Sequence, residues 1–139
     1  MEISFKRLTA DAILPTKAHP TDIGFDLYTV NQIMIRPGQQ FHIDTGIAVG
    51  FPKGIAGLIL DKSSIGAKGI KVMGGVIDQA YTGPLIVCFR NLSDEAVYFG
   101  AGAKIAQLVL IPSYEVRIIE VEHLGETDRG SKGFGSSGA

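Results

Sequence analysis

The stretch from residue 40 to residue 60, QFHIDTGIAVGFPKGIAGLIL, holds the pattern that decides the fold. Phe41, Ile43 and Thr45 alternate with two polar residues, which is the period of a strand with one buried face. Residues 52–54 (PKG) stop this run, and a second apolar run, IAGLIL, follows directly. Because proline and glycine favour turns, the stretch is predicted to form two strands joined by a turn.

Similar β-rich runs recur along the chain, separated by glycine, proline, asparagine or aspartate. They are EISFKRL (2–8), GFDLYTV (24–30), IMIR (33–36), PLIVCFR (84–90), AVYF (96–99), KIAQLVLI (104–111) and YEVRIIEVE (114–122). Helical periodicity is scarce, and roughly ten short strands at this spacing are typical of an all-β sandwich or barrel. The unbroken apolar runs LIVC and LVLI predict strands that are covered on both faces.

Length and composition set the broad class. The 139 residues are 45% hydrophobic and 19% charged, which predicts one globular domain. A net charge of −1 offers no basic surface, so we expect no direct nucleic-acid binding. We expect no secretory signal and no membrane contact, because no apolar run approaches the ~18 residues of a spanning helix. The single cysteine, Cys88, is interpreted as a core thiol and fits a cytoplasmic location.

Glycine is concentrated in two places. It accounts for 18 of the 139 residues, with the excess in residues 63–83 and after residue 127, whereas its usual share is ~7%. Glycine permits positive φ and lets a backbone approach a ligand closely, so functional residues are expected in these stretches. The composition predicts a β domain over residues 1–125 and a flexible, Gly/Ser-rich arm over residues 126–139.

The first candidate motif is LDKSSIGAKGI, residues 60–70. It follows an apolar strand and supplies a cation from Lys62, hydroxyls from Ser63 and Ser64, and backbone N–H groups. These are the components of a phosphate-binding loop. Lysine and serine are also common in solvated turns, so both interpretations are open.

The second candidate motif is GGVIDQAYTG, residues 74–83. Asp78 follows the apolar pair Val76 and Ile77, and glycines bracket the segment as in a tight β-hairpin. A carboxylate held at the tip of such a hairpin can act as a general base on water, and Tyr81 can offer its ring to a sugar or a base. An ordinary hairpin with aspartate as turn former fits as well.

Two further polar residues stand among apolar neighbours. Asp26 in PTDIGFDL (20–27) is a candidate for holding Mg²⁺ through water, or else an outward-facing strand residue. Gln107 in KIAQLVL (104–110) requires a hydrogen-bond partner, which is either the backbone or a ligand. The three histidines are widely spaced and show no metal-ligand pattern.

Taken in order, five segments resemble the five sequence motifs of the trimeric dUTPase family. They are PTDIGFDL, DKSSIGAKG, GGVIDQAYTG, GAKIAQLVL and RGSKGFGSSG, and together they run from residue 20 to residue 138. The resemblance implies a jelly-roll β-sandwich that forms a homotrimer, with each active site shared among subunits. It also implies Mg²⁺-assisted hydrolysis of dUTP to dUMP and pyrophosphate, which limits uracil in DNA and supplies dUMP for dTTP synthesis.

The resemblance also assigns roles to residues. Asp78 would deprotonate the water that attacks the α-phosphorus, and Asp26 would help to hold Mg²⁺ through water. The nucleotide would be bound at Lys62, Ser63, Ser64, Gly75, Val76, Ile77, Tyr81, Gln107, Arg129, Phe134, Gly135, Ser136 and Ser137. In this assignment Tyr81 crowds out a 2′-hydroxyl. The C-terminal arm closes over a neighbour's site, with Phe134 on the uracil ring and Arg129 at the γ-phosphate.

One departure and two rival readings accompany the resemblance. Most family members carry arginine where this chain has Lys62, which gives a point charge instead of a bidentate fork. The related dCTP deaminases require a catalytic glutamate where this chain places Cys88, which disfavours deamination. A nucleotide-gated interaction protein with a regulatory protein partner is the other alternative, and a pull-down with and without dUTP would discriminate it.

Overall fold

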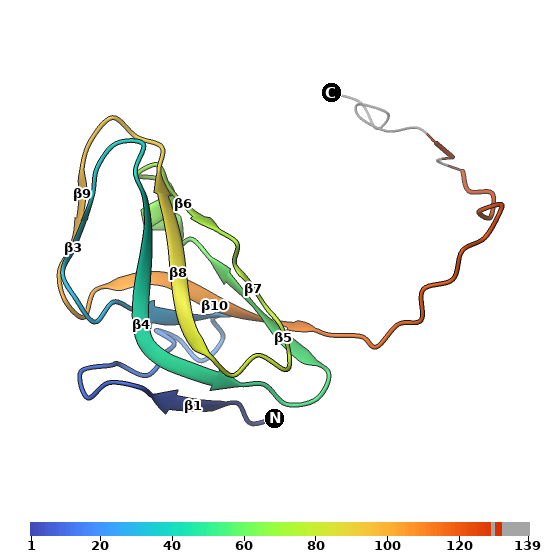
Figure 1. The fold of residues 1–139 in the computed structure, drawn as a ribbon, viewed down its shortest axis with the longest axis horizontal. Helices are drawn as coiled ribbons and strands as arrows, with labels where there is room; N and C mark the ends of the chain where they lie inside the picture. Colours follow the sequence, from blue (N-terminus) through green and yellow to red (C-terminus); the bar gives the residue numbers. More distant parts are fainter. Residues whose placement is uncertain (129, 132–139) are drawn as a thin grey trace.

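The computed structural model describes residues 1–128 and 130–131. This part of the chain contains ten strands and one short helix (Figure 1). The strands are β1 (Ser4–Arg7), β2 (Gly24–Tyr28), β3 (Ile33–Ile35), β4 (Gln40–Gly50), β5 (Ile55–Leu60), β6 (Ile70–Met73), β7 (Val76–Ile77), β8 (Pro84–Asn91), β9 (Val97–Phe99) and β10 (Lys104–Pro112), and the helix is α1 (Ser63–Gly66). No helix in these ranges is long and apolar enough to cross a bilayer.

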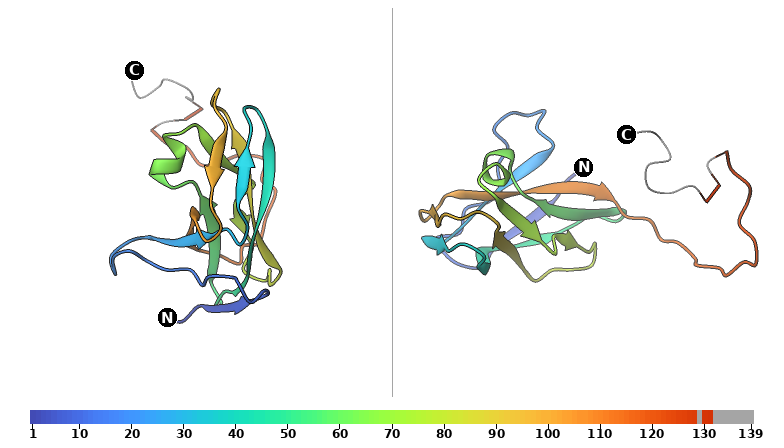
Figure 2. Two further views of the ribbon diagram at one scale, coloured as in Figure 1. Left: turned by 90° about the vertical axis from the view of Figure 1, so that its left-hand side faces the viewer. Right: turned by 90° about the horizontal axis from the view of Figure 1, so that it is seen from above.

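The strands form two antiparallel four-stranded sheets and a two-stranded ribbon. One sheet has the order β1-β4-β8-β6, the other has the order β2-β10-β5-β7, and β3 pairs with β9 (Figures 1 and 2). Leu27, Leu85, Phe89 and Leu108 are fully buried in the core that these elements enclose. The predicted all-β sandwich is confirmed.

Strand β4 contains the alternation seen in the sequence and then bends. His42 and Asp44 are exposed while Ile43 and Thr45 are buried, as predicted. The register with β8 shifts between Asp44 and Ala48, where Gly46 has φ +69°. A side chain at Gly46 would also collide with three neighbouring side chains at 2.7–2.9 Å. This glycine lets one strand pair with β8 in its first half and β1 in its second.

The outer face of β8 differs from the prediction. Ile86 is 41% exposed, and Cys88 is half-buried on the same face. The apolar run LIVC is therefore not covered on both faces within the chain, and the interpretation of Cys88 as a core thiol is wrong. Residues at every second position of this strand point away from the sandwich core.

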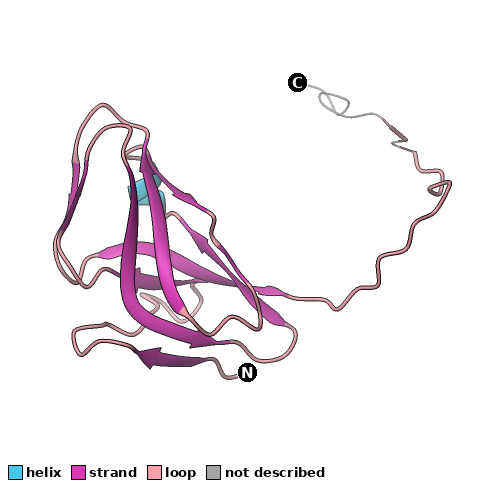
Figure 3. Ribbon diagram, viewed as in Figure 1, coloured by secondary structure: helices cyan, strands magenta, loops and turns pink. Residues whose placement is uncertain are grey.

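The predicted strand over residues 114–122 is also wrong for the single chain. After β10 ends at Pro112, residues 113–128 extend away from the sandwich as loop (Figure 3). Tyr114 is 79% exposed, Ile118 92% and Leu124 87%. A strand requires a pairing edge as well as the right residues, and this segment leaves the two sheets behind.

Candidate functional site

Asp78 lies on a loop that connects the two sheets, residues 74–84, which we call the Asp78 loop. Before it, β6 pairs with β8 in one sheet, and within it β7 pairs with β5 in the other. The predicted β-hairpin is therefore wrong, because the two arms of this loop belong to different sheets. Gly74 turns the chain with φ +63°, and a Cβ on Gly75 would lie 2.1 Å from the carbonyl oxygen of Ile59. Only glycine lets the chain pass from one sheet to the other this closely.

The tip of the Asp78 loop forms the rim of a small pocket of about 160 Å³, lined by Val76, Ile77, Asp78, Tyr81, Pro84 and Ile86. The carboxylate of Asp78 is exposed. The backbone N–H of Tyr81 donates to the carbonyl oxygen of Asp78 at 3.0 Å, and the N–H of Gly54 donates to Oε1 of Gln79 at 2.7 Å. An exposed carboxylate on an anchored loop can accept a proton from water beside a ligand in the pocket.

A second group lies around Asp26, and we call it the Asp26 cluster. It consists of the predicted site residues Asp26, Lys62, Ser63, Ser64 and Gln107, together with Lys104. Asp26 is only 5% exposed, so the interpretation of it as an outward-facing strand residue is wrong. Its Oδ1 accepts a hydrogen bond from Nζ of Lys62, and its Oδ2 lies 2.6 Å from Nζ of Lys104. Burial opposes ionisation, but the hydrogen bonds and charges of the two lysines outweigh it and hold the pKa of Asp26 below its usual value.

Gln107 links strand β2, which carries Asp26, to the turn after β5, which carries Lys62. It lies directly opposite Asp26 across β10 and β2, and its Nε2 donates to the carbonyl oxygen of Asp61 at 3.1 Å. Gln107 therefore has a backbone partner in this structure, and its role toward a ligand stays a prediction. Its amide lies over Gly24, where a Cβ would be 2.1 Å from Oε1. The two serine hydroxyls project from exposed residues at the start of α1.

Asp61 contributes a second ion pair next to this cluster. Its Oδ1 accepts from Nζ of Lys71 at 2.6 Å, and this hydrogen bond lowers the pKa of Asp61. The pair ties the turn after β5 to β6. The backbone that carries Lys62 is therefore held from both sides, by Gln107 and by Lys71.

The Asp78 loop and the Asp26 cluster lie toward opposite ends of β5. Ile77 is opposite Gly57 near the start of that strand, whereas Gln107 is opposite Leu60 at its end. By strand register, Asp78 and Lys62 are about six positions apart, on the order of 15–20 Å at the rise of a β-strand. In Figure 3 the helix α1 lies at one end of the sandwich and the loop after β7 at the other. The predicted site residues that the structure describes therefore form two separate groups within one chain.

The fit to a metal ion is limited. Among the described residues, no group of three or more His, Cys, Asp or Glu side chains could hold a metal. Both carboxylate oxygens of Asp26 already have a lysine partner. Mg²⁺ typically keeps several waters and takes one or two carboxylates together with substrate phosphates. A Mg²⁺ ion at this site would therefore have to receive most of its ligands from water and a bound polyphosphate.

Some site residues lie elsewhere or were missed. The predicted residues Arg129, Phe134, Gly135, Ser136 and Ser137 lie outside the described residues. Lys104 was not singled out from the sequence, although it stands at the start of the apolar strand β10. The pairing register of β10 with β2 places Lys104 near Asp26, and short-range sequence patterns do not contain this register.

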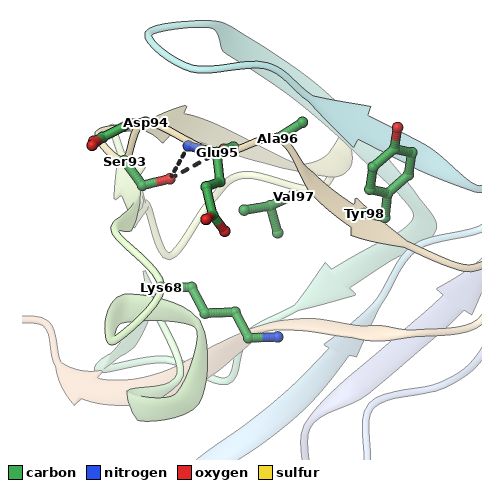
Figure 4. A pocket seen from close by; sticks show the side chains of 7 residues that line it. All are labelled: Lys68, Ser93, Asp94, Glu95, Ala96, Val97 and Tyr98. Atoms are coloured by element: carbon green, nitrogen blue, oxygen red, sulfur yellow. Dashed lines mark hydrogen bonds between the residues drawn. The ribbon is translucent and has the colours of Figure 1, made fainter.

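Another pocket, of about 510 Å³, lies between α1 and β9 (Figure 4). Lys68 and Glu95 extend into it from opposite sides, and Tyr98 stands at one end. It contains none of the predicted site residues. The chemistry of the motifs is therefore concentrated at the smaller pocket of the Asp78 loop and at the Asp26 cluster.

Comparisons with known proteins agree on one family. The sequence profile of the dUTPase family matches residues 10–138. The chain is 40% identical to a deoxyuridine 5′-triphosphate nucleotidohydrolase of Clostridium kluyveri, over 99% of both chains. A Staphylococcus bacteriophage 80alpha dUTPase, solved with dUpNHpp, superposes with a TM-score of 0.92 at 28% identity, over 99% of both chains. A mutant dUTPase from phage phi11 of S. aureus, whose structure reveals the coordination of a structural Mg(II) ion, shares the fold with a TM-score of 0.82 at 24% identity, over 88% of this chain and 98% of that one.

Proposed function

The chain belongs to the dUTPase family, and from this premise we propose how its residues hydrolyse dUTP to dUMP and pyrophosphate. The observation that carries the proposal is the exposed carboxylate of Asp78 at the rim of a pocket on an anchored loop. In this proposal Asp78 accepts a proton from the water that attacks the α-phosphorus. The bond between the α-phosphorus and its bridging oxygen breaks, and pyrophosphate leaves.

Recognition of uracil is assigned to the backbone of the Asp78 loop, from Gly75 to Tyr81. Pairing of Val76 and Ile77 with β5 fixes these peptide groups before a ligand arrives. Fixed donors and acceptors reject cytosine, because its 4-amino group mismatches them. Exclusion of the thymine methyl group is assigned to the same loop, which lines a pocket of about 160 Å³. The ring of Tyr81 would lie against the deoxyribose.

Binding of the phosphates is assigned to Lys62, Ser63, Ser64 and Gln107. Positive charge and N–H or O–H donors stabilise the charge that develops on the phosphoryl group and on the leaving pyrophosphate. In the structure the ammonium of Lys62 donates to Asp26, and its remaining N–H donors would be directed to a phosphate. Lys104 remains on the other oxygen and keeps Asp26 neutralised.

Mg²⁺ is the proposed cofactor. When bound, it would neutralise the phosphate oxygens and orient them for displacement. Asp26 would help to hold it through water, since Mg²⁺ in proteins keeps several waters and takes few carboxylates. The residues of the chain would supply the proton acceptor and the donors around the phosphates.

We infer that the active site is shared between subunits of a homotrimer. Asp78 and Lys62 must lie along one triphosphate, yet the register of β5 and β7 separates them by roughly 15–20 Å in a single chain. A neighbouring subunit that brings its Asp26 cluster to this Asp78 loop completes the site. The exposed apolar side chains of Ile86, Tyr114, Ile118 and Leu124 are further support, since exposed apolar surface of this kind marks interfaces.

The C-terminal residues 126–139 are proposed as an arm that closes over a site in the trimer. Phe134 would stack on uracil, Arg129 would reach the γ-phosphate, and Gly135, Ser136 and Ser137 would donate hydrogen bonds. Closure of such an arm excludes water that does not react. In the cell the reaction would limit uracil in DNA and supply dUMP for dTTP synthesis, and a reducing, cytoplasmic compartment fits the single cysteine.

The direct test is pyrophosphate release from dUTP, dCTP, dTTP and UTP, with ammonia release from dCTP as the assay for a deaminase. We expect efficient turnover of dUTP alone. No ammonia is expected, because β8 carries no acidic residue. Turnover of dCTP with release of ammonia would contradict the proposed reaction.

A further inference from the structure

The ring of Tyr81 lies directly over Gly83. A Cβ built on Gly83 would be 2.6 Å from the hydroxyl oxygen of Tyr81, 2.7 Å from Cζ and 3.0 Å from Cε2. Such separations are far below ordinary van der Waals contact, so the phenol occupies the space that any side chain at residue 83 would fill. The side chain of Tyr81 thus folds over the residue two positions further along the same loop.

Two hydrogen bonds hold Tyr81 in place, one from its hydroxyl and one from its backbone N–H. Its hydroxyl donates a hydrogen bond to the carbonyl oxygen of Pro84 at 2.9 Å, and the backbone N–H of Tyr81 donates to the carbonyl oxygen of Asp78 at 3.0 Å. The side chain is 42% exposed, so its outer side faces the pocket that Val76, Ile77 and Asp78 also line. The hydrogen bond to Pro84 holds the phenol against the loop when no side chain is present at residue 83.

Backbone conformation does not explain the glycine at this position. Gly74 has a φ of +63°, in the region that favours glycine, whereas Gly83 is not among the glycines with positive φ. An alanine at residue 83 is therefore compatible with the backbone. What the glycine supplies is space for the ring of Tyr81.

We propose that Gly83 is a specificity-determining positioning residue, which acts on the sugar of the nucleotide through Tyr81. With no side chain at residue 83, the ring lies flat against the loop, and its outer side sets the room left for the pentose. The inference rests on the proposed function, in which Tyr81 meets the deoxyribose. Beyond that function, we infer that discrimination against a 2′-hydroxyl also depends on Gly83 and on the carbonyl oxygen of Pro84. Both would act through the ring of Tyr81, without touching the sugar.

The decisive variant is Gly83→Ala. The atoms closest to the new methyl group are the far end of a side chain, so the ring can rotate outward while the loop keeps its path. The matched control is Gly100→Ala, which adds the same methyl group where nothing lies within 4 Å and where φ is not positive. We expect the ratio of kcat/KM for dUTP to that for UTP to fall by about tenfold in Gly83→Ala, the scale of a changed steric contact in a pocket. Gly100→Ala should keep the wild-type ratio.

Two further measurements separate the inference from the proposed function. In the wild-type protein, NMR should give cross-relaxation between the ring protons of Tyr81 and the α-protons of Gly83, whatever the activity. Tyr81→Phe keeps the ring but removes the bond to Pro84, so its dUTP/UTP ratio should fall less than that of Gly83→Ala. A wild-type ratio in both variants, with dUTP still hydrolysed, would overturn the role of Gly83 and leave the proposed function intact. Absence of dUTP hydrolysis by the wild-type trimer would overturn both.

Discussion

The Asp78 loop and the Asp26 cluster are built in different ways. The loop is held by backbone pairing with β5 and by glycines at positions where a Cβ would collide, so its shape is fixed by main-chain geometry. The cluster is held by charged side chains, with Asp26 between Lys62 and Lys104, and such pairs can exchange partners. In the proposed function this difference becomes a division of work: the rigid part would recognise the base and hold the proton acceptor, and the adaptable part would receive the charged phosphates.

The largest effect is expected at the rigid part. Asp78→Asn removes the proton acceptor and should lower kcat for dUTP by about 10³-fold, within the range of general base catalysis. Because residue 78 is exposed, the variant should keep its fold and its oligomeric state, measured by circular dichroism and by light scattering. Asp94→Asn, at another exposed aspartate, is the control and should retain wild-type turnover. A fully active Asp78→Asn protein would remove the basis of the proposed mechanism.

At the adaptable part we expect a smaller loss. Lys62→Ala should lower kcat/KM by about 10–100-fold, the contribution of one charged hydrogen bond to a phosphate. Lys62→Arg should retain activity, because the charge stays and the guanidinium can reach both Asp26 and an anion. Lys68→Ala tests a neighbouring exposed lysine and should behave as wild type. Equal activities of Lys62→Ala and Lys68→Ala would rule out the role of Lys62.

Gly75→Ala tests whether backbone geometry fixes the Asp78 loop. The added methyl group meets the carbonyl of Ile59, which is backbone and cannot rotate away. We expect a loss of about 1–3 kcal/mol in the free energy of unfolding, as for other overpacked sites. Urea denaturation measures it, and Gly100→Ala should cause no comparable loss. An unchanged midpoint for Gly75→Ala would show that the loop adapts as readily as the cluster.

The smallest effect is expected from Lys104→Met, which removes one of the two cations on Asp26. The pKa of Asp26 is lowered in the folded protein. Ionised Asp26 therefore stabilises the fold at pH values above its pKa in the unfolded chain, which is ~4. That contribution is lost as the pH falls below ~4 toward the folded pKa. Lys104→Met should therefore be less stable than wild type at pH 7, and the difference should shrink as the pH falls below ~4. A difference in thermal midpoint that is the same at pH 7 and at pH 3 would contradict the coupling.

The fold and the residue types of the site could be predicted from the sequence, but their arrangement could not. Alternation at Ile43 and Thr45 predicts a half-buried strand, since side-chain period is a local property. The pairing of Asp26 with Lys104 depends on the register of distant strands, which local patterns do not encode. The same holds for the Asp78 loop, because nothing in residues 74–83 reveals that β7 joins β5. The segment at 114–122 has strand-forming residues but lies beyond the edges that the single chain provides.

Division of the site between subunits is tested most directly by mixing two variants that are each impaired in a different part of the site. Asp78→Asn keeps the Asp26 cluster, and Lys62→Ala keeps the Asp78 loop, so a mixed trimer regains one complete site of three. Random reassembly from an equal mixture should restore about one quarter of wild-type turnover of dUTP, because about three quarters of the trimers are mixed. Mixtures that were never unfolded together should show only the mean activity of the two separate variants. If the reassembled mixture is no more active than its two components, both halves of each site come from one chain, and the shared site is refuted.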